Sequence, residues 1–258
     1  MSNSTHWKTV SQIYHSIGQP PLQPNQEVIN YFYHRVPKTA RMLMLGVTPL
    51  IASSYDIVTA VDKESKMIEN LWIGNTSTKK VINDNWLTVE LPLNHYDGIL
   101  GDCSANVLPT SQDVVALFEH ALNWLTPGGY FACRFFTRPL IPVTLEQLQA
   151  QATHPTMNFS AYKRLLPAYI AAQTGNGWVT TKSMAELFNE LFPNRSNLPW
   201  DEKQLASIDR YAVNDGTTWF PTRQEVFDLI PVTARHVQFV DVGTYDLAEN
   251  CPILEFTK

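Results

Sequence analysis

The chain has 258 residues, of which 44% are hydrophobic and 17% are charged, with a formal net charge of −5 at pH 7. This composition is typical of a globular protein with one large core and excludes a disordered chain. The net negative charge disfavours general binding to nucleic acid, and no apolar run approaches the roughly 18 residues that cross a membrane. We therefore expect a soluble protein that acts on small molecules, with no nucleic-acid or membrane partner.

The cysteines and the first residues indicate the compartment. Cys103, Cys133 and Cys251 are odd in number and far apart in the sequence, which is unlike a disulfide framework. Residues 1–8 lack the basic and then apolar pattern of a secretory signal. Both observations favour a reducing, cytoplasmic setting.

The first segment, residues 1–38, is expected to form a helical cap ahead of a sheet. Apolar side chains recur at intervals of three and four over residues 4–17, which predicts an amphipathic helix that ends at Gly18. The proline-rich stretch that follows cannot continue this helix. Asn25 is then placed to cap a second helix.

Residues 39–138 alternate between strand and helix patterns, which favours a mostly parallel sheet. Strands are expected at Arg41–Val47, Ile57–Val61, Lys79–Ile82, Tyr96–Asp102 and Tyr130–Phe136. Helices are expected at Pro49–Ser54, Ser65–Trp72 and Asp113–Trp124. A Leu-Thr-Pro-Gly-Gly turn at residues 125–129 then separates the last helix from the last strand.

The regular alternation stops over residues 139–216, which we expect to form a helical insertion or lid. The segment has four helical patterns broken by prolines and no run typical of a strand. The patterns lie at Leu145–Ala152, Ala161–Ala172, Lys182–Leu191 and Glu202–Ala212, and the prolines are Pro155, Pro167, Pro193 and Pro199.

The last segment, residues 217–258, returns to the sheet. A helix is expected at Thr222–Ile230, followed by two apolar runs at His236–Val242 and Pro252–Thr257 that a polar loop joins. Such a late pair favours an antiparallel hairpin that closes a mostly parallel sheet.

The strongest functional pattern is a strand, a turn and a second strand around Gly46 and Asp62. A turn at Gly46 can bring the backbone close to a ligand, and a carboxylate at the end of the second strand accepts hydrogen bonds from a ribose diol. Thr48-Pro49 stands where a dinucleotide fingerprint has further glycines, so room for a pyrophosphate is not evident. A nucleoside cofactor without a diphosphate is indicated, and S-adenosylmethionine fits best.

Over residues 41–134 the chain resembles the class I S-adenosylmethionine-dependent methyltransferases. The matching positions are Gly46 in the first motif, Asp62 as the ribose-binding acid, Asn85-Trp86 near the adenine, Tyr96–Asp102 as the fourth motif, and Leu125–Gly129 as the post motif. The resemblance implies one Rossmann-like α/β domain, a sandwich around a mostly parallel seven-stranded sheet with an antiparallel C-terminal hairpin and a helical insertion. It also implies methyl transfer from S-adenosylmethionine.

The resemblance implies a set of site residues, with Asp102 as the catalytic candidate that faces both cofactor and acceptor and helps to orient the acceptor. The Thr48 hydroxyl is expected to substitute for a close backbone approach, and Tyr14 on the first helix to lie over the methionine end of the cofactor. The cofactor-binding candidates are Tyr14, Gly46, Thr48, Asp62, Lys63, Met67, Asn85, Trp86, Asp102, Cys103 and Ser104.

Several of these residues also have purely structural interpretations. Asp62 could cap the following helix, Asn85 could form an Asx turn, and Cys103 and Ser104 could simply pack, since no His or Lys beside them marks an activated nucleophile. The aromatic pair Trp219-Phe220 could line an acceptor pocket or belong to the core. The histidines, which include His6, His15, His34 and His95, are scattered without ligand spacing, so no metal is expected.

The acceptor is expected to be a small molecule that is methylated on nitrogen or oxygen. The fourth motif lacks the Asn/Asp-Pro-Pro-Tyr/Phe sequence of enzymes that methylate nucleobase amino groups. Three alternatives stay open. A non-catalytic binder or scaffold of the same fold agrees with the altered Thr48-Pro49 turn, a nicotinamide oxidoreductase would need the missing glycines, and an aminopropyl transferase would need an acidic polyamine site that is not evident.

Overall fold

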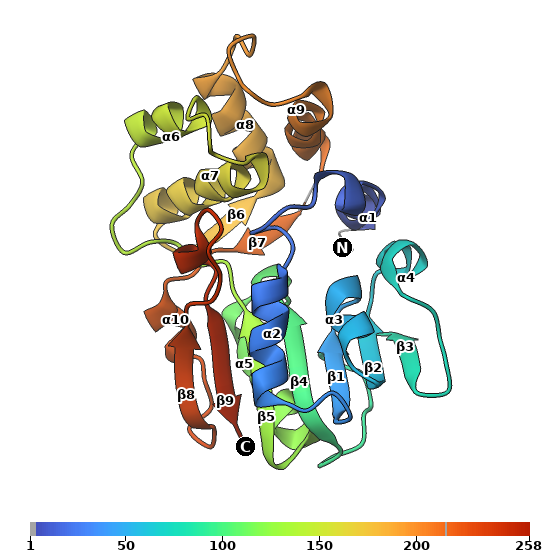
Figure 1. The fold of residues 1–258 in the computed structure, drawn as a ribbon. Helices are drawn as coiled ribbons and strands as arrows, with labels where there is room; N and C mark the ends of the chain where they lie inside the picture. The colour runs from blue at the N-terminus through green and yellow to red at the C-terminus, as the bar shows by residue number, and fades with distance from the viewer. Residues whose placement is uncertain (1–3, 215) are drawn as a thin grey trace.

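The computed structural model describes residues 4–214 and 216–258, and its centre is a seven-stranded sheet of order β3-β2-β1-β4-β5-β9-β8 (Figure 1). The strands are β1 (Arg41–Leu45), β2 (Ile57–Asp62), β3 (Lys79–Asn83), β4 (Tyr96–Asp102), β5 (Leu125–Arg134), β8 (Arg235–Val240) and β9 (Ile253–Thr257). Strands β1 to β5 pair in parallel, and β9 is antiparallel to both β5 and β8. The predicted sheet with its antiparallel C-terminal hairpin is confirmed.

Helices cover both faces of this sheet, as the alternation of side chains along β1 requires. Leu43 and Leu45 pack on one face in a core shared with α5, whereas Met42 and Met44 pack on the other with α2 and α3. The helices of this part are α1 (Ser4–Ile17), α2 (Gln26–Arg35), α3 (Pro49–Ser54), α4 (Ser65–Leu71), the 3-10 turn η1 (Ala105–Val107) and α5 (Ser111–Trp124).

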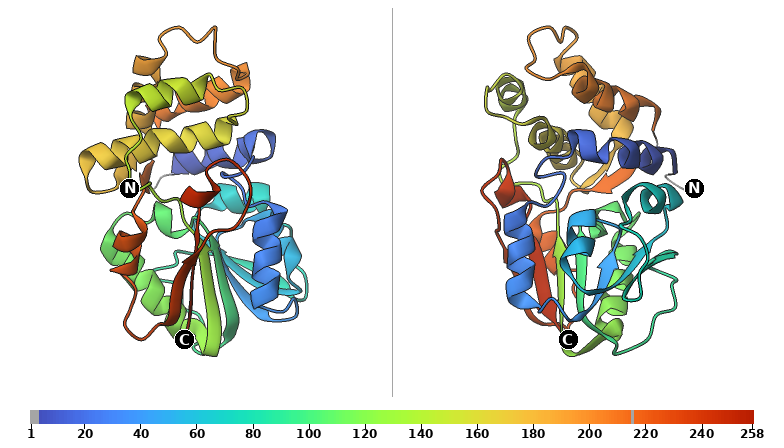
Figure 2. Two further views of the ribbon diagram at one scale, coloured as in Figure 1. Left: turned by 60° about the vertical axis from the view of Figure 1, so that its left-hand side comes forward. Right: turned by 45° about the vertical axis from the view of Figure 1, so that its right-hand side comes forward.

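The N-terminal cap is fixed to the sheet by polar contacts. Asn25 caps α2 by accepting a hydrogen bond from the Val28 amide at 3.1 Å. The Tyr31 hydroxyl donates to Glu255 of β9 at 2.7 Å, and Arg35 pairs with the same carboxylate at 3.1 Å. Helix α2 therefore lies against the central strands, whereas α1 reaches over the carboxyl ends of the sheet (Figure 2).

The insertion has its own apolar core above the sheet (Figure 2). Its elements are α6 (Leu145–Ala152), α7 (Phe159–Thr174), β6 (Trp178–Thr180), α8 (Thr181–Leu191), α9 (Glu202–Asp209), the 3-10 turn η2 (Arg210–Val213) and β7 (Thr217–Trp219). The four predicted helical patterns are present, the last one ending as η2.

Two expectations for the insertion are wrong. Strand β6 interrupts the helices and pairs with β7, and three-residue strands are too short to give a periodic signal. Pro167 does not break its helix but lies buried inside α7. The packing of that buried face compensates for the roughly 3 kcal/mol that an internal proline costs.

Two boundaries also differ from the predicted ones. Residues 125–129 belong to β5 rather than to a separate turn, and the β4–β5 register shifts there, with Gly128 at a φ of 76°. Helix α10 (Arg223–Phe227) is shorter than predicted, because a capping box between Thr222 and Glu225 fixes its start and it ends at Phe227. None of the helices in residues 4–214 and 216–258 combines the length and apolarity needed to cross a bilayer.

Candidate active site

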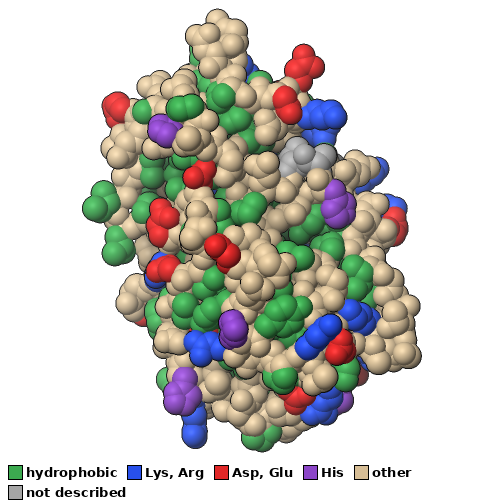
Figure 3. Space-filling model, in the orientation of Figure 1, with side chains coloured by type: hydrophobic (Ala, Val, Ile, Leu, Met, Phe, Trp, Pro, Cys, Tyr) green, Lys and Arg blue, Asp and Glu red, His purple; other side chains and the backbone are tan. Residues whose placement is uncertain are grey.

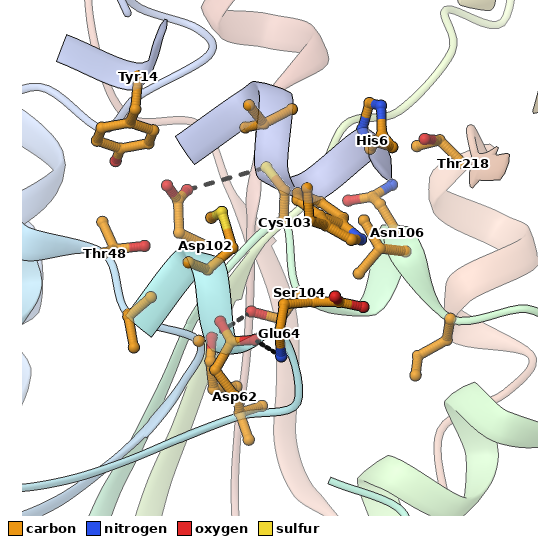
Figure 4. A pocket seen from close by; sticks show the side chains of 18 of the residues that line it. His6, Tyr14, Thr48, Asp62, Glu64, Asp102, Cys103, Ser104, Asn106 and Thr218 are labelled. Atoms are coloured by element: carbon orange, nitrogen blue, oxygen red, sulfur yellow. Dashed lines mark hydrogen bonds between the residues drawn. The ribbon is translucent and has the colours of Figure 1, made fainter. Parts of the chain in front are cut away.

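A cavity lies where the carboxyl ends of β1, β2 and β4 face α1 and the insertion (Figure 4). This is the edge at which ligands collect in open α/β sheets. We call the sheet side the strand-end wall, formed by Gly46, Thr48, Asp62, Asn85 and Asp102 with their neighbours, and the insertion side the lid wall, formed by Arg164, Thr181, Met184 and Tyr211. All eleven residues expected to bind the cofactor line this cavity, and Tyr14 does so from α1.

Gly46 and Asp62 lie next to each other at the ends of β1 and β2. The Gly46 amide donates to the Val61 carbonyl at 2.8 Å, and its φ of 103° is a left-handed conformation that favours glycine. A Cβ built on Gly46 would lie 3.9 Å from Asp62 Oδ2. The absence of a side chain at Gly46 therefore leaves space beside the Asp62 carboxylate.

Asp62 is only 7% exposed, and burial raises its pKa to about 6. Its Oδ1 accepts a hydrogen bond from the Glu64 amide at 2.9 Å. Glu64, not Asp62, is the N-cap of α4, so the simple capping role does not apply. A buried carboxylate whose second oxygen faces a glycine turn is suited to accept hydrogen bonds from a ligand.

Asn85 and Trp86 combine a structural role with their place in the cavity. The Asn85 side chain accepts a hydrogen bond from the Leu87 amide at 3.1 Å. This contact is the Asx turn that the sequence offered as a structural role for Asn85. The indole of Trp86 donates to the Val61 carbonyl at 2.6 Å and holds its half-buried ring beside Asp62. Lys63, in the loop before α4, and Met67, in the first turn of α4, also line the cavity.

Asp102 is held by a cation that the sequence analysis missed. Arg134, at the end of β5, has no exposed surface and donates its Nε to Asp102 Oδ1 at 2.7 Å. Figure 4 shows the Asp102 carboxylate on the side of the cavity where Tyr14 lies. Burial, and after it the charge of Asp102, raise the pKa of Tyr14, so that hydroxyl stays protonated. Arg134 is the one charged residue of β5, and a charge in a buried strand is the sequence signal that could have indicated a buried ion pair.

Cys103 and Ser104 line the cavity, and neither has the environment of an activated nucleophile. Cys103 has a φ of 56°, and its Sγ lies 3.9 Å from Asp102 Oδ1. Burial raises the pKa of the Cys103 thiol well above its usual range, so it is not a thiolate nucleophile at neutral pH. The Ser104 hydroxyl is buried and donates to the Leu45 carbonyl at 2.6 Å, which links β4 to β1.

The lid side of the cavity comes from residues that sequence reasoning did not select, among them Arg164, Thr181, Met184, Tyr211 and Thr218, and α1 adds His6. Trp219 and Phe220 are not on the cavity surface but are buried in the core, Phe220 stacked on Phe136 with a 6.0 Å centroid distance. The buried amide of Asn106 donates to the Phe136 and Trp219 carbonyls at 2.9 and 2.7 Å. Asn106 thereby joins the insertion to the sheet.

Within residues 4–214 and 216–258 no three His, Cys, Asp or Glu side chains are grouped so that they could hold a metal ion.

No known family model and no curated protein sequence matches this chain. Among solved structures, the N-methyltransferase NodS from Bradyrhizobium japonicum, in complex with S-adenosyl-L-homocysteine, matches 97% of this chain over 98% of its own, with 10% identity and a TM-score of 0.50. The chain has the fold of the class I methyltransferases.

A second protein, from Rhodobacter sphaeroides, is provisionally named a zinc-dependent alcohol dehydrogenase. It matches all of this chain over 99% of its own, with 13% identity and a TM-score of 0.64. At such identities the likeness establishes the fold alone, and chemistry has to be argued from the site.

Proposed function

We propose that this chain is an S-adenosylmethionine-dependent methyltransferase that acts on a small-molecule acceptor, by N- or O-methylation. The observation that carries the proposal is the buried Asp62 carboxylate at the end of β2, beside the glycine turn that ends β1. The fold shared with NodS supports it, because NodS is described with S-adenosyl-L-homocysteine bound.

The residues of the strand-end wall fit the cofactor by their chemistry. Asp62 would accept hydrogen bonds from the ribose hydroxyls, and the half-buried Trp86 and Asn85 would lie by the adenine. Gly46 lacks the Cβ that would crowd the ligand. Thr48 begins α3 without using its side chain as a cap, so the hydroxyl is available at the methionine end. The cofactor would supply an activated methyl group on its sulfonium.

The protein's task is then to position the acceptor and exclude water, since displacement at a methyl sulfonium is an in-line reaction with a good leaving group. Arg134 fixes Asp102 through Oδ1. The carboxylate would accept a hydrogen bond from an acceptor amine or hydroxyl and set its direction. Because the Asp102 charge is already paired, we assign this residue an orienting role.

The acceptor class is inferred from the surface and from the cavity. On the face seen in Figure 3, basic side chains lie among acidic ones. The net charge of −5 adds no general attraction to nucleic acid. A cavity roofed by α1 and the insertion suits a small acceptor better than a polymer.

A non-catalytic cofactor binder of the same fold is the second candidate. The paired state of Asp102 favours it, since the charge of this carboxylate is already matched by a buried arginine inside the protein. Cofactor binding without turnover across a broad acceptor set would support this candidate over the enzyme.

Isothermal titration with S-adenosylmethionine, S-adenosylhomocysteine and NADH tests the proposal. We expect the first two to bind with dissociation constants on the order of micromolar, about −8 kcal/mol, and NADH not to bind. Binding of NADH in preference to both would favour the oxidoreductase alternative, and absence of all three would contradict the proposed cofactor.

A further inference from the structure

Two adjacent cations of α7 have no carboxylate partner, Arg164 on the lid wall and Lys163 behind it. Among the described residues neither forms an ion pair, whereas Arg134, Arg138 and Arg195 each have an acidic partner. Burying an unpaired charge is costly unless it is solvated or hydrogen-bonded. A negatively charged group on a molecule that enters the cavity would give these cations the acidic partner that the described residues do not supply.

Lys163 is the deeper of the two, with 3% of its surface exposed. Its Nζ donates to the Ser207 hydroxyl at 3.3 Å and lies 4.5 Å from the ring centroid of Tyr211. Burial lowers the pKa of Lys163, and the groups that act on it are Tyr211 and Arg164. Ring faces and a hydroxyl thus stabilise this ammonium in place of a carboxylate.

Arg164 lies on the cavity surface itself. Its guanidinium carbon is 4.8 Å from the centroid of Phe136 and 6.0 Å from that of Phe220, and its buried Nε has no hydrogen-bond partner. Stacking on a ring fixes the plane of a guanidinium and leaves its edge free to donate. That edge has the fork geometry that matches a carboxylate or a phosphate.

Tyr211 of η2 completes the arrangement. Burial alone would raise its pKa, but hydrogen bonds and charge from Lys163 and Arg164 outweigh burial and lower it. Both cations can only donate, so the phenolic oxygen accepts from them and keeps its own hydrogen as a donor for a ligand. A hydroxyl polarised in this way is a strong donor to an anion.

The opposite side of the cavity carries the reverse charge. Its three carboxylates, on Asp62, Glu64 and Asp102, outnumber Lys63 on the same wall and the buried Arg134 that pairs with Asp102. An anion is therefore repelled from the sheet side and attracted to α7 and η2.

We propose that the methyl acceptor carries an anionic group, a carboxylate or a phosphate, which Arg164 and Tyr211 bind at the lid wall with Lys163 behind them. This inference rests on the proposed function, and it directs the anionic end of the acceptor to the lid and the methylated atom to Asp102.

Titration of the wild-type protein, saturated with S-adenosylhomocysteine, with benzoate, phenyl phosphate and benzamide tests the proposal. Benzamide has the shape of benzoate without its charge. We expect one of the two anions to bind at least about tenfold more tightly than benzamide, since a charge-assisted hydrogen bond adds roughly 1.5 to 3 kcal/mol. The better anion identifies carboxylate or phosphate. Equal binding of all three probes, or binding of none, would overturn the inference.

Variants then locate the anion. Arg164→Gln and Lys163→Met should reduce the preference for the anion to within about threefold of benzamide, or below 1 kcal/mol. Lys203→Gln removes an exposed charge from α9 of the same insertion and should keep the full preference. If a variant fails to fold by circular dichroism, the three-probe comparison on the wild type decides alone.

The cofactor provides the discriminating readout, because a methionine carboxylate is also an anion. We expect Arg164→Gln to change the affinity for S-adenosylhomocysteine by less than about threefold. A loss of tenfold or more with the anion preference intact would assign Arg164 to the cofactor and overturn the inference. If the wild type does not bind S-adenosylhomocysteine, the proposed function fails, and the same three probes titrated without it still test the cation pair.

Discussion

The two walls of the cavity are built by different means. At the strand-end wall, Asp62 of β2 and Asp102 of β4 flank the end of β1, and the register of the parallel sheet fixes each position. At the lid wall, Arg164 and Tyr211 come from helices of an insertion that has its own core. The strand ends of a sheet hold their side chains in fixed positions, whereas the sequence of helices in an insertion can change without disturbing the sheet. The comparison agrees with the proposed division, in which the sheet would hold the cofactor and the insertion would select the acceptor.

The largest expected effect concerns the stability of the strand-end wall. Asp102→Ala leaves Arg134 buried without its partner and should lower the free energy of unfolding by about 3 to 5 kcal/mol, as measured by urea denaturation. Asp97→Ala, on the same strand, breaks a half-exposed pair with Arg41 and should cost about 1 kcal/mol or less. Equal losses in the two variants would show that the buried pair does not fix this wall.

Asp62→Ala separates cofactor binding from stability. Loss of a charged acceptor for two ribose hydroxyls should weaken S-adenosylhomocysteine binding by about 100-fold in isothermal titration, or roughly 3 kcal/mol. Stability should not fall, because the buried carboxylate is itself unfavourable. Asp56→Ala, just before the exposed start of β2, is the matched control and should bind normally. Wild-type affinity in Asp62→Ala would contradict the assigned ribose role.

The pKa of Asp62 also predicts a pH dependence. Burial raises that pKa to about 6, above the value of the unfolded chain. The native state therefore keeps the proton longer, and the stability that it provides is present at low pH and lost as pH rises through 6. Binding has the opposite sign, because the ionised form accepts the ribose hydrogen bonds.

We expect S-adenosylhomocysteine affinity to weaken about tenfold from pH 7 to pH 5, since one pH unit below the pKa leaves roughly a tenth of the carboxylate ionised. Titrations at a series of pH values measure this change. Asp62→Asn should bind weakly at every pH, and a pH dependence that persists in this variant would assign the titration to another group.

The smallest expected effect distinguishes the glycine turn from ordinary backbone strain. Gly46 and Gly74 have similar φ values of 103° and 96°, so alanine at either should cost about 1 kcal/mol of stability. Only Gly46→Ala should also weaken S-adenosylhomocysteine binding, by several-fold in titration. An equal effect of both variants on binding would remove the turn from the cofactor site.

The strand-end wall could be predicted from the sequence because parallel strands bring their carboxyl ends to one edge. Gly46, Asp62 and Asp102 needed only their strands to be recognised, and the structure places them in one cavity. The functional roles of these residues stay predictions. Arg134 was missed because its pairing with Asp102 depends on the register of two strands, which no local pattern records.

The lid wall could not be predicted for a related reason. Arg164 and Tyr211 meet through the packing of α7 against η2, and each has an ordinary sequence environment. Strands β6 and β7 pair with each other although α8 and α9 separate them in the sequence. Each strand is too short to show an alternation of apolar and polar residues. Trp219 and Phe220 were plausible pocket residues, but both are buried in the core, where Asn106 donates a hydrogen bond to the Trp219 carbonyl.

The contact between α2 and β9 has a consequence for how the chain folds. Arg35 and Glu255 are 220 residues apart, so their pairing closes a very long loop and cannot form until β9 has taken its place beside β5. Residues this distant contribute slow steps to folding. The polar contacts that join α2 to β9 therefore depend on a strand that is synthesised long after the helix itself.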